Sequence, residues 1–211
     1  MGHKHADAAL LNQAAEWRLI GLLLERPRRG WHADVAAVAK EVGDRKLRGA
    51  ATAARAATEG DYLHLLGPGG VVSPREVTYQ PFADPGQLLA QLASFYDAFA
   101  FRPRAEEPDD HIAVEAAFVG YLLLKQAFAT AHGAAEAAAT TAAARADFVD
   151  THLATFALSF AQRLESATGS YLHHTALCLA ARVPARPLMA PAAFPTDTLD
   201  PCGGCGVDRT Y

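Results

Sequence analysis

Residues 107–131 read EPDDHIAVEAAFVGYLLLKQAFATA and combine an acidic start with a long apolar pattern. Apolar side chains recur three or four positions apart, at Ile112, Ala116, Val119 and Leu123. That spacing is typical of the buried face of an α-helix. The opening Glu107-Pro108-Asp109-Asp110 places negative charge at the positive end of the helix dipole. We therefore predict a helix that begins at Glu107 and ends near residue 131.

The composition of the whole chain favours the same class of structure. Of the 211 residues, 47 are alanine, the strongest helix former and a poor strand former. Hydrophobic residues make up 51% and charged residues 20%, so the chain can bury a sizeable core and wholesale disorder is excluded. The net charge of -4 argues against a nucleic-acid-binding surface. The predicted fold is all-α, a single-domain helical bundle.

Helical spacing and chain breakers divide the rest of the sequence. They predict helices over residues 6–25, 32–42, 45–58, 61–66, 84–99 and 170–183, and a further helix or a broken pair of helices over 134–165. The segment 71–83 contains Pro74 and Pro81 and is expected to be irregular. Prolines then accumulate after Val183. The predicted organisation is a helical domain over 1–183 and an extended proline-rich arm over 184–211.

No membrane or targeting segment is predicted. The apolar run Leu19–Leu24 is too short to span a bilayer, and acidic residues interrupt the region where a signal peptide would lie. The chain has only three cysteines, an odd count that argues against a disulfide scaffold. We expect a cytoplasmic protein without stable membrane insertion.

An acidic cluster around His111 is the first candidate for chemistry. Four carboxylates lie within residues 106–110, and Glu115 follows His111 by four positions, hence on one helix face. Such a pair could hold a metal, transfer protons or clamp a cationic partner. The alternative without function is a capped helix start with a solvated histidine.

The arm carries a second candidate, Cys202-Gly203-Gly204-Cys205. Two cysteines at this spacing can bind zinc or form a redox pair. Further donors for a zinc site could be Cys178, His152, His173 and His174, although the spacing selects none of them. The alternative is an unconstrained arm, with Cys178 as an inert core thiol. For the His173-His174 pair we expect one partly buried ring and one exposed ring.

Motifs of common enzymes are missing from the sequence. There is no Gly-x-Ser-x-Gly of a serine hydrolase and no Glu-x-x-His of a di-iron bundle. The Gly67-Pro68-Gly69-Gly70 segment lacks the lysine of a phosphate-binding loop. Catalysis is therefore not predicted.

Three separated segments resemble one known family. They are Leu65-Leu66-Gly67-Pro68-Gly69 followed by Ser73-Pro74-Arg75-Glu76 and Tyr79; Glu107-Pro108-Asp109-Asp110-His111; and Phe148, His152-Leu153, Phe156 and Phe160. The second is similar to a Glu-Pro-x-Asp-His signature and is the most specific of the three. In this order, over roughly residues 10–183, the sequence resembles the TorD/DmsD/NarJ family of redox-enzyme maturation chaperones.

The resemblance implies a non-enzymatic chaperone that needs no cofactor. Its partner would be the catalytic subunit of a molybdenum-containing oxidoreductase, bound through the twin-arginine leader before export. Carried over by position, the peptide-binding residues are Asp110, His111, Pro108, Asp109, Glu107, Glu115, Glu76, Tyr79 and Leu66. An apolar groove would add Leu65, Val71, Phe82 and Phe99.

Several alternatives stay open at this level. One is a metal-binding or metal-delivery protein with zinc at Cys202 and Cys205, and another is a helical assembly module without a dedicated client. The identity of the client, and a monomeric or homodimeric state, are likewise left open by the sequence.

Overall fold

The computed structural model describes residues 2–103, 106–167 and 170–184, and within them it contains helices and no β-strand. The all-α prediction is confirmed. The first half comprises α1 (Gly2–Leu24), α2 (Trp31–Val38), α3 (Arg45–Ala53), the 3-10 turn η1 (Ala54–Ala56), α4 (Glu59–Leu66), the 3-10 turn η2 (Glu76–Tyr79) and α5 (Pro85–Ala98). The second half comprises α6 (Ile112–Ala131), α7 (Ala135–Phe148), the π-helical turn η3 (Val149–Leu153), α8 (Ala154–Arg163), the 3-10 turn η4 (Leu164–Ala167) and α9 (Tyr171–Ala180).

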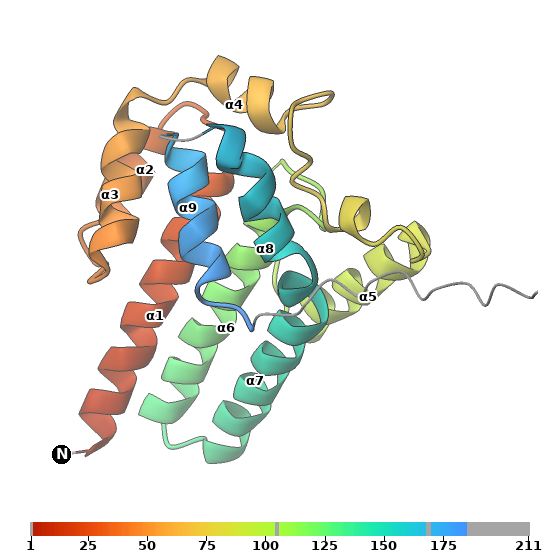
Figure 1. Cartoon of the computed structure of the whole chain (residues 1–211). Helices are drawn as coiled ribbons and strands as arrows, with labels where there is room; N and C mark the ends of the chain where they lie inside the picture. The colour runs from red at the N-terminus through yellow and green to blue at the C-terminus, as the bar shows by residue number, and fades with distance from the viewer. Residues whose placement is uncertain (1, 104–105, 168–169, 185–211) are drawn as a thin grey trace, which may run out of the picture.

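The helices α1 and α6 lie side by side along the length of the bundle (Figure 1). Two glycines allow this close approach. A Cβ atom on Gly120 would lie 3.1 Å from the backbone nitrogen of Arg18, and one on Gly21 would lie 3.1 Å from the carbonyl oxygen of Ala113. At each contact the glycine of one helix therefore lies against the backbone of the other helix.

We expect the substitution Gly120→Ala to lower the free energy of unfolding by about 1–3 kcal/mol, because the added methyl group overpacks the contact with α1. Gly49→Ala in α3 is the matched control, since a Cβ there would meet no atom within 4 Å. The control is expected to gain about 0.5–1 kcal/mol from helix propensity alone. Urea unfolding followed by circular dichroism measures both. A gain of equal size at Gly120 would contradict the close contact.

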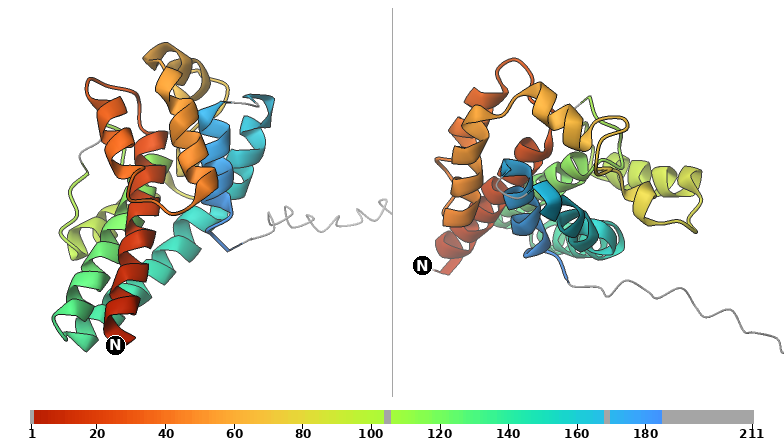
Figure 2. Two further views of the ribbon diagram at one scale, coloured as in Figure 1. Left: turned by 90° about the vertical axis from the view of Figure 1, so that its left-hand side faces the viewer. Right: turned by 45° about the horizontal axis from the view of Figure 1, so that its top comes forward.

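The other helices surround this pair. α9 lies between α3 and α8, while α5 projects from the side of the bundle opposite α2 and α3 (Figures 1 and 2). The end of α9 is fastened by Arg182, whose guanidinium donates to Asp44 at 2.7 Å and to Glu16 at 3.0 Å. Asp44 also caps the first turn of α3, so one carboxylate links two helices.

An aromatic cluster joins α5 to the central helices. Phe118 is fully buried, and its ring centroid lies 4.9 Å from that of Tyr96, 4.7 Å from that of Phe148 and 5.2 Å from that of Phe101. These rings meet edge-to-face or tilted, the arrangement that aromatic quadrupoles favour. α5 begins as predicted, with the Asp84 side chain accepting from the Gln87 backbone N–H and Pro85 in the first turn.

α6 is long and apolar enough to cross a membrane by length and composition. However, 67% of its apolar window is buried inside the bundle. A mostly buried apolar helix is what the core of a helical domain requires. We therefore assign the hydropathy of α6 to packing against α1 and α7.

The predicted start of α6 is wrong. α6 begins at Ile112 rather than at Glu107, because the backbone of residues 110–112 bonds to another segment. The region 134–165, predicted as one helix or a broken pair, comprises α7 and α8 with the π-helical turn η3 between them. The predicted arm lies outside the described residues from residue 185 onward, as do Cys202 and Cys205.

Candidate functional site

The site forms where the irregular segment 67–84 meets the start of α6. Arg75 and His111 form an isolated antiparallel bridge. The Glu76 backbone N–H donates to the Asp110 carbonyl at 2.9 Å, and the Ile112 N–H donates to the Pro74 carbonyl at 2.9 Å. These bonds use the backbone groups that would otherwise extend α6 towards its N-terminus. The acidic residues 107–110 consequently precede the helix instead of forming its first turn.

Asp110 is paired within the chain. Both Nε and Nη2 of Arg75 contact the same oxygen, Oδ1, at 2.8 and 2.7 Å. The Asp110 side chain is fully buried, whereas the Arg75 side chain remains 40% exposed. Oδ2 of Asp110 is buried without a hydrogen-bond partner among the described residues. The guanidinium therefore covers the carboxylate from the solvent side and satisfies only one of its two oxygens.

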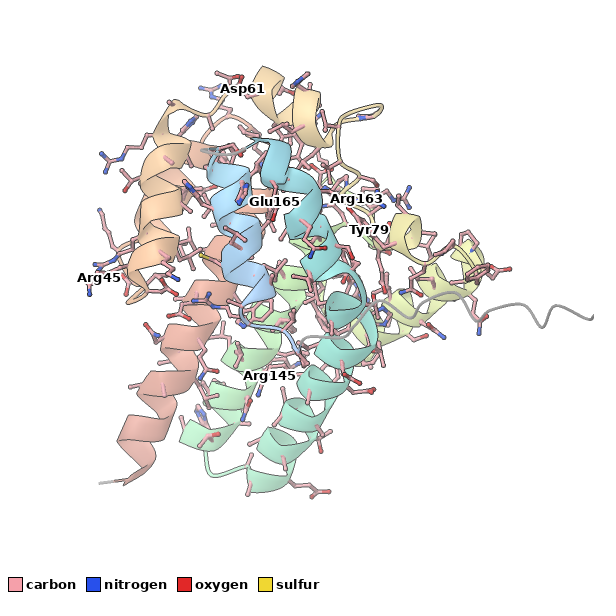
Figure 3. All side chains as sticks on the ribbon, viewed as in Figure 1. Arg45, Asp61, Tyr79, Arg145, Arg163 and Glu165 are labelled. Atoms are coloured by element: carbon pink, nitrogen blue, oxygen red, sulfur yellow. The ribbon has the colours of Figure 1, made fainter. Side chains whose placement is uncertain are left out.

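A second buried pair holds the same segment against α8. Oε2 of Glu76, which is fully buried, lies 2.9 Å from Nδ1 of His152 in η3. Gln80 donates to the other oxygen of Glu76. Three residues after Glu76, Tyr79 lies beside Arg163 of α8, with the guanidinium 4.8 Å from the ring centroid (Figure 3). Segment 67–84 is thus held at two neighbouring points, one on α6 and one on η3 and α8.

His111 caps α6 with its ring. Nδ1 accepts from the Ala113 backbone N–H at 3.1 Å, so the ring proton must reside on Nε2. Nε2 then donates to the Tyr62 hydroxyl at 3.1 Å, and Tyr62 donates to the Leu24 carbonyl at 3.3 Å. Burial and, to a lesser extent, the nearby charge of Arg75 lower the pKa of His111 to about 3. The imidazole is therefore neutral and serves as a structural cap that connects α6, α4 and α1.

Glu115 lies in the first turn of α6 and is fully buried. Neither of its carboxylate oxygens has a hydrogen-bond partner among the described residues. Burial, together with the charges of Glu76 and Asp110, raises the pKa of Glu115 well above its ordinary value. Three carboxyl groups thus converge on one place beneath segment 67–84, with Arg75 and His152 as the cationic or proton-donating neighbours.

A second group of carboxylates faces solvent near the same place. Asp109 is exposed and Glu107 is half-buried. Burial, and to a smaller degree the charge of Glu107, raises the pKa of Glu25 to about 7, although Arg28 acts in the opposite direction. The charges of Glu25 and Glu107 therefore repel each other, and an added cation beside them would relieve that repulsion.

The structure separates the predicted peptide-binding residues into two sets. The first set is buried and comprises Asp110, His111, Glu115, Glu76 and Leu66. The second set is exposed or half-buried and comprises Pro108, Asp109, Glu107 and Tyr79. In this conformation only the second set is accessible to a peptide, and the peptide-binding role of Asp110 and the other buried residues stays a prediction.

The apolar residues expected near the clamp also differ in exposure. Phe82 is 90% exposed and Val71 is 57% exposed, both in segment 67–84. Phe99 and Leu65 are half-buried and pack against the core. A hollow of about 360 Å³ lies between α2 and α3, and one of about 300 Å³ lies beside α4 and α9. Leu65 lines the second hollow, and none of the other predicted peptide-binding residues lines either of the two.

Three residues of the candidate site were not predicted from the sequence. Arg75 was noted only as part of a motif, and its pairing with Asp110 has no signal in the local sequence. Tyr96 pins the acidic segment through its hydroxyl, which donates to the Asp109 carbonyl at 2.8 Å. Glu25 is far from Glu107 in the sequence, yet its carboxyl group lies close enough for the two charges to interact. A single acidic residue at the end of an apolar helix is a common pattern, so nothing in the sequence selects Glu25.

The remaining candidates find structural places. Cys178 is a buried free thiol, and its burial raises the pKa of the sulfhydryl. His173 is buried and its Nδ1–H donates to the Leu164 carbonyl, whereas His174 is exposed, as expected for this pair. Among the residues that the structure describes, no group of three or more His, Cys, Asp and Glu side chains is arranged to hold a metal ion.

Comparison with known proteins supplies the family. The family described as nitrate reductase delta subunit matches residues 29–162, which is more than half of the chain. No curated protein and no solved structure matches the chain. The matched range contains the whole junction between segment 67–84, the start of α6 and η3. The chain belongs to the nitrate reductase delta subunit family, a family of chaperones for the maturation of molybdenum enzymes rather than of catalysts.

Proposed function

We propose that this chaperone binds the twin-arginine leader of the catalytic subunit of a molybdenum-containing oxidoreductase and retains the subunit until its cofactor is inserted. The observation that carries the proposal is the bridge between Arg75 and His111. The bridge joins the end of the acidic segment to the irregular segment, which carries exposed apolar side chains. A leader with two guanidinium groups followed by an apolar stretch requires both features.

The charge of the surface supports recognition of arginine. Asp109 is exposed and Glu107 is half-buried on this surface, and the charge of Glu107 adds to the effect of burial in raising the pKa of Glu25. A guanidinium bound between such carboxylates gains charge-assisted hydrogen bonds and relieves their mutual repulsion. Arginine suits this geometry better than lysine because its planar group can contact two oxygens at once.

The apolar side chains of segment 67–84 support the second half of the contact. Phe82 and Val71 expose large hydrophobic groups to solvent at 90% and 57%. Exposed aromatic and aliphatic side chains beside a charged patch are typical of a peptide-binding surface. We place the apolar stretch of the leader along this segment.

The test is a binding titration with a fluorescent peptide that contains an Arg-Arg leader sequence, read by anisotropy. We expect the double substitution Glu107→Lys/Asp109→Lys to weaken binding by about tenfold or more, equivalent to roughly 1.4 kcal/mol. The melting temperature should change little because Asp109 is exposed and Glu107 is half-buried.

The control is Glu136→Lys, an exposed acidic residue at the start of α7. It lies beyond the far end of α6, which is about 30 Å from the site for a helix of 20 residues. The control should bind the peptide as the parent does. Equal affinity of the parent and the double variant, or of Arg-Arg and Lys-Lys peptides, would remove the acidic surface as the leader site.

A further inference from the structure

The guanidinium of Arg75 contacts Asp110 in the way that a bound arginine from another molecule could. Its guanidinium approaches Asp110 from solvent, keeps 40% of its side chain exposed and binds one oxygen of a fully buried carboxylate. The second oxygen, Oδ2, is buried and unpartnered within the described chain. A guanidinium that lay in the plane of the carboxylate could donate to both oxygens at once, which is the stronger arrangement. The intramolecular pair therefore leaves unused binding capacity at Asp110.

The orphaned oxygens of Glu115 point to the same conclusion independently. Both are buried without a partner beneath segment 67–84. Buried carboxylates without hydrogen bonds destabilise a fold, and they persist where another requirement retains them. Asp110 and Glu115 thus contribute three buried oxygens without a hydrogen-bond partner among the described residues, and Arg75 is the cation that contacts Asp110.

The Arg75 side chain can leave without unfolding the segment. The contacts that fix the local backbone are main-chain bonds, from Glu76 N–H to the Asp110 carbonyl and from Ile112 N–H to the Pro74 carbonyl. Glu76 is also held by His152. None of these contacts involves the guanidinium of Arg75. A change of its rotamer would therefore expose Asp110 while the bridge stays intact.

We propose that Arg75 occupies, from within the chain, the buried site that one arginine of the leader takes in the complex, so that the peptide binds by displacing it. This inference rests on the proposed function and assigns Asp110 a direct role that its burial otherwise excludes. Arg75 then sets the affinity: the chain is competent to bind only in the fraction of molecules whose Arg75 has left Asp110. It also sets specificity, because a competing lysine offers no planar fork.

The decisive comparison is leader affinity in the parent, Arg75→Ala and Arg45→Ala. Removing Arg75 should tighten binding of the Arg-Arg peptide by about tenfold, because the internal competitor is gone. Arg45→Ala removes the same charge from α3, on the far side of the molecule from Tyr79 and segment 67–84 (Figure 3). It should leave affinity within about twofold, since a remote exposed charge is screened. Combining Arg75→Ala with Asp110→Asn should abolish the gain.

A second measurement protects the test against misfolding. Arg75→Ala leaves Asp110 buried without its partner, so the variant should melt at a lower temperature than the parent. Millimolar N-acetyl-arginine amide should restore part of that loss in Arg75→Ala and should not stabilise the parent, while N-acetyl-lysine amide should do neither. The milder variant Arg75→Lys serves for the titration if the alanine variant is insoluble.

The outcomes separate the two proposals. If the parent binds the leader and Arg75→Ala binds it equally or more weakly, and arginine amide gives no rescue, the displacement is wrong and the leader site stands. If no form binds the leader but arginine amide rescues Arg75→Ala, the guanidinium site is real and the proposed client contact is wrong. Absence of both binding and rescue overturns both.

Discussion

Replacing Glu76 by alanine is expected to lower the free energy of unfolding by about 3–5 kcal/mol, the range for removing one member of a buried ionic or hydrogen-bonded pair. Glu76 is fully buried and accepts from Gln80 while it pairs with His152 at 2.9 Å. Its loss leaves two buried polar groups without their acceptor. It also frees segment 67–84 from η3, so leader binding should weaken together with stability.

Urea unfolding at neutral pH, followed by circular dichroism, measures this loss. Glu76→Gln is the matched variant, because the amide oxygen keeps one acceptor at nearly the same volume, and its loss should be clearly smaller. A loss below about 1 kcal/mol for the alanine variant would show that the pair contributes as little as an exposed one. Segment 67–84 would then be held mainly by its backbone bonds.

Replacing Glu115 by methionine is expected to act in the opposite direction. The parent carries a buried carboxyl group whose oxygens have no partner among the described residues. Substituting an apolar side chain of similar length should raise the free energy of unfolding at pH 8 by about 1–3 kcal/mol, the cost of an unsatisfied buried polar group. Leader binding should not improve, since Glu115 is fully buried rather than at the surface.

The pH dependence gives the same prediction a second readout. Burial raises the pKa of Glu115 in the folded chain above its value in the unfolded chain. Between those two values the folded state holds the extra proton, so the stability of the parent falls as the pH rises through that interval. Glu115→Met should remove this slope. The free energy of unfolding of parent and variant should be measured from about pH 4 to about pH 9. Parallel curves over this range would contradict a raised pKa at Glu115.

Local sequence was sufficient for the helices and their caps. Asp84 and Pro85 start α5 because a carboxylate oxygen and a fixed φ angle favour the first turn, and both are visible in two adjacent letters. The apolar face of α6 follows from its spacing. Fold class and family resemblance were therefore within reach of the sequence.

The pairing of residues far apart in the sequence could not be predicted. The acidic residues at 107–110 suggested an open cation site, yet Asp110 bonds to Arg75, 35 positions away, and Glu76 bonds to His152, 76 positions away. Which carboxylates face solvent depends on these partners rather than on the spacing of the carboxylates. The helix start was misplaced for the same reason, because the backbone at Asp110 and Ile112 bonds to segment 67–84.

The π-helical turn Val149–Leu153 also makes the fold sensitive to insertion or deletion of a residue at this position. Each α-helical residue advances the side-chain direction by about 100°, and a π-turn accommodates one surplus residue without propagating that rotation. Excision of exposed Thr151 would pull the turn into regular helix and rotate α8 against the bundle. Either His152 would leave Glu76, or Phe156 and Phe160 would leave the core. Evolutionary indels should therefore be rare at this turn and common in connections such as residues 67–70.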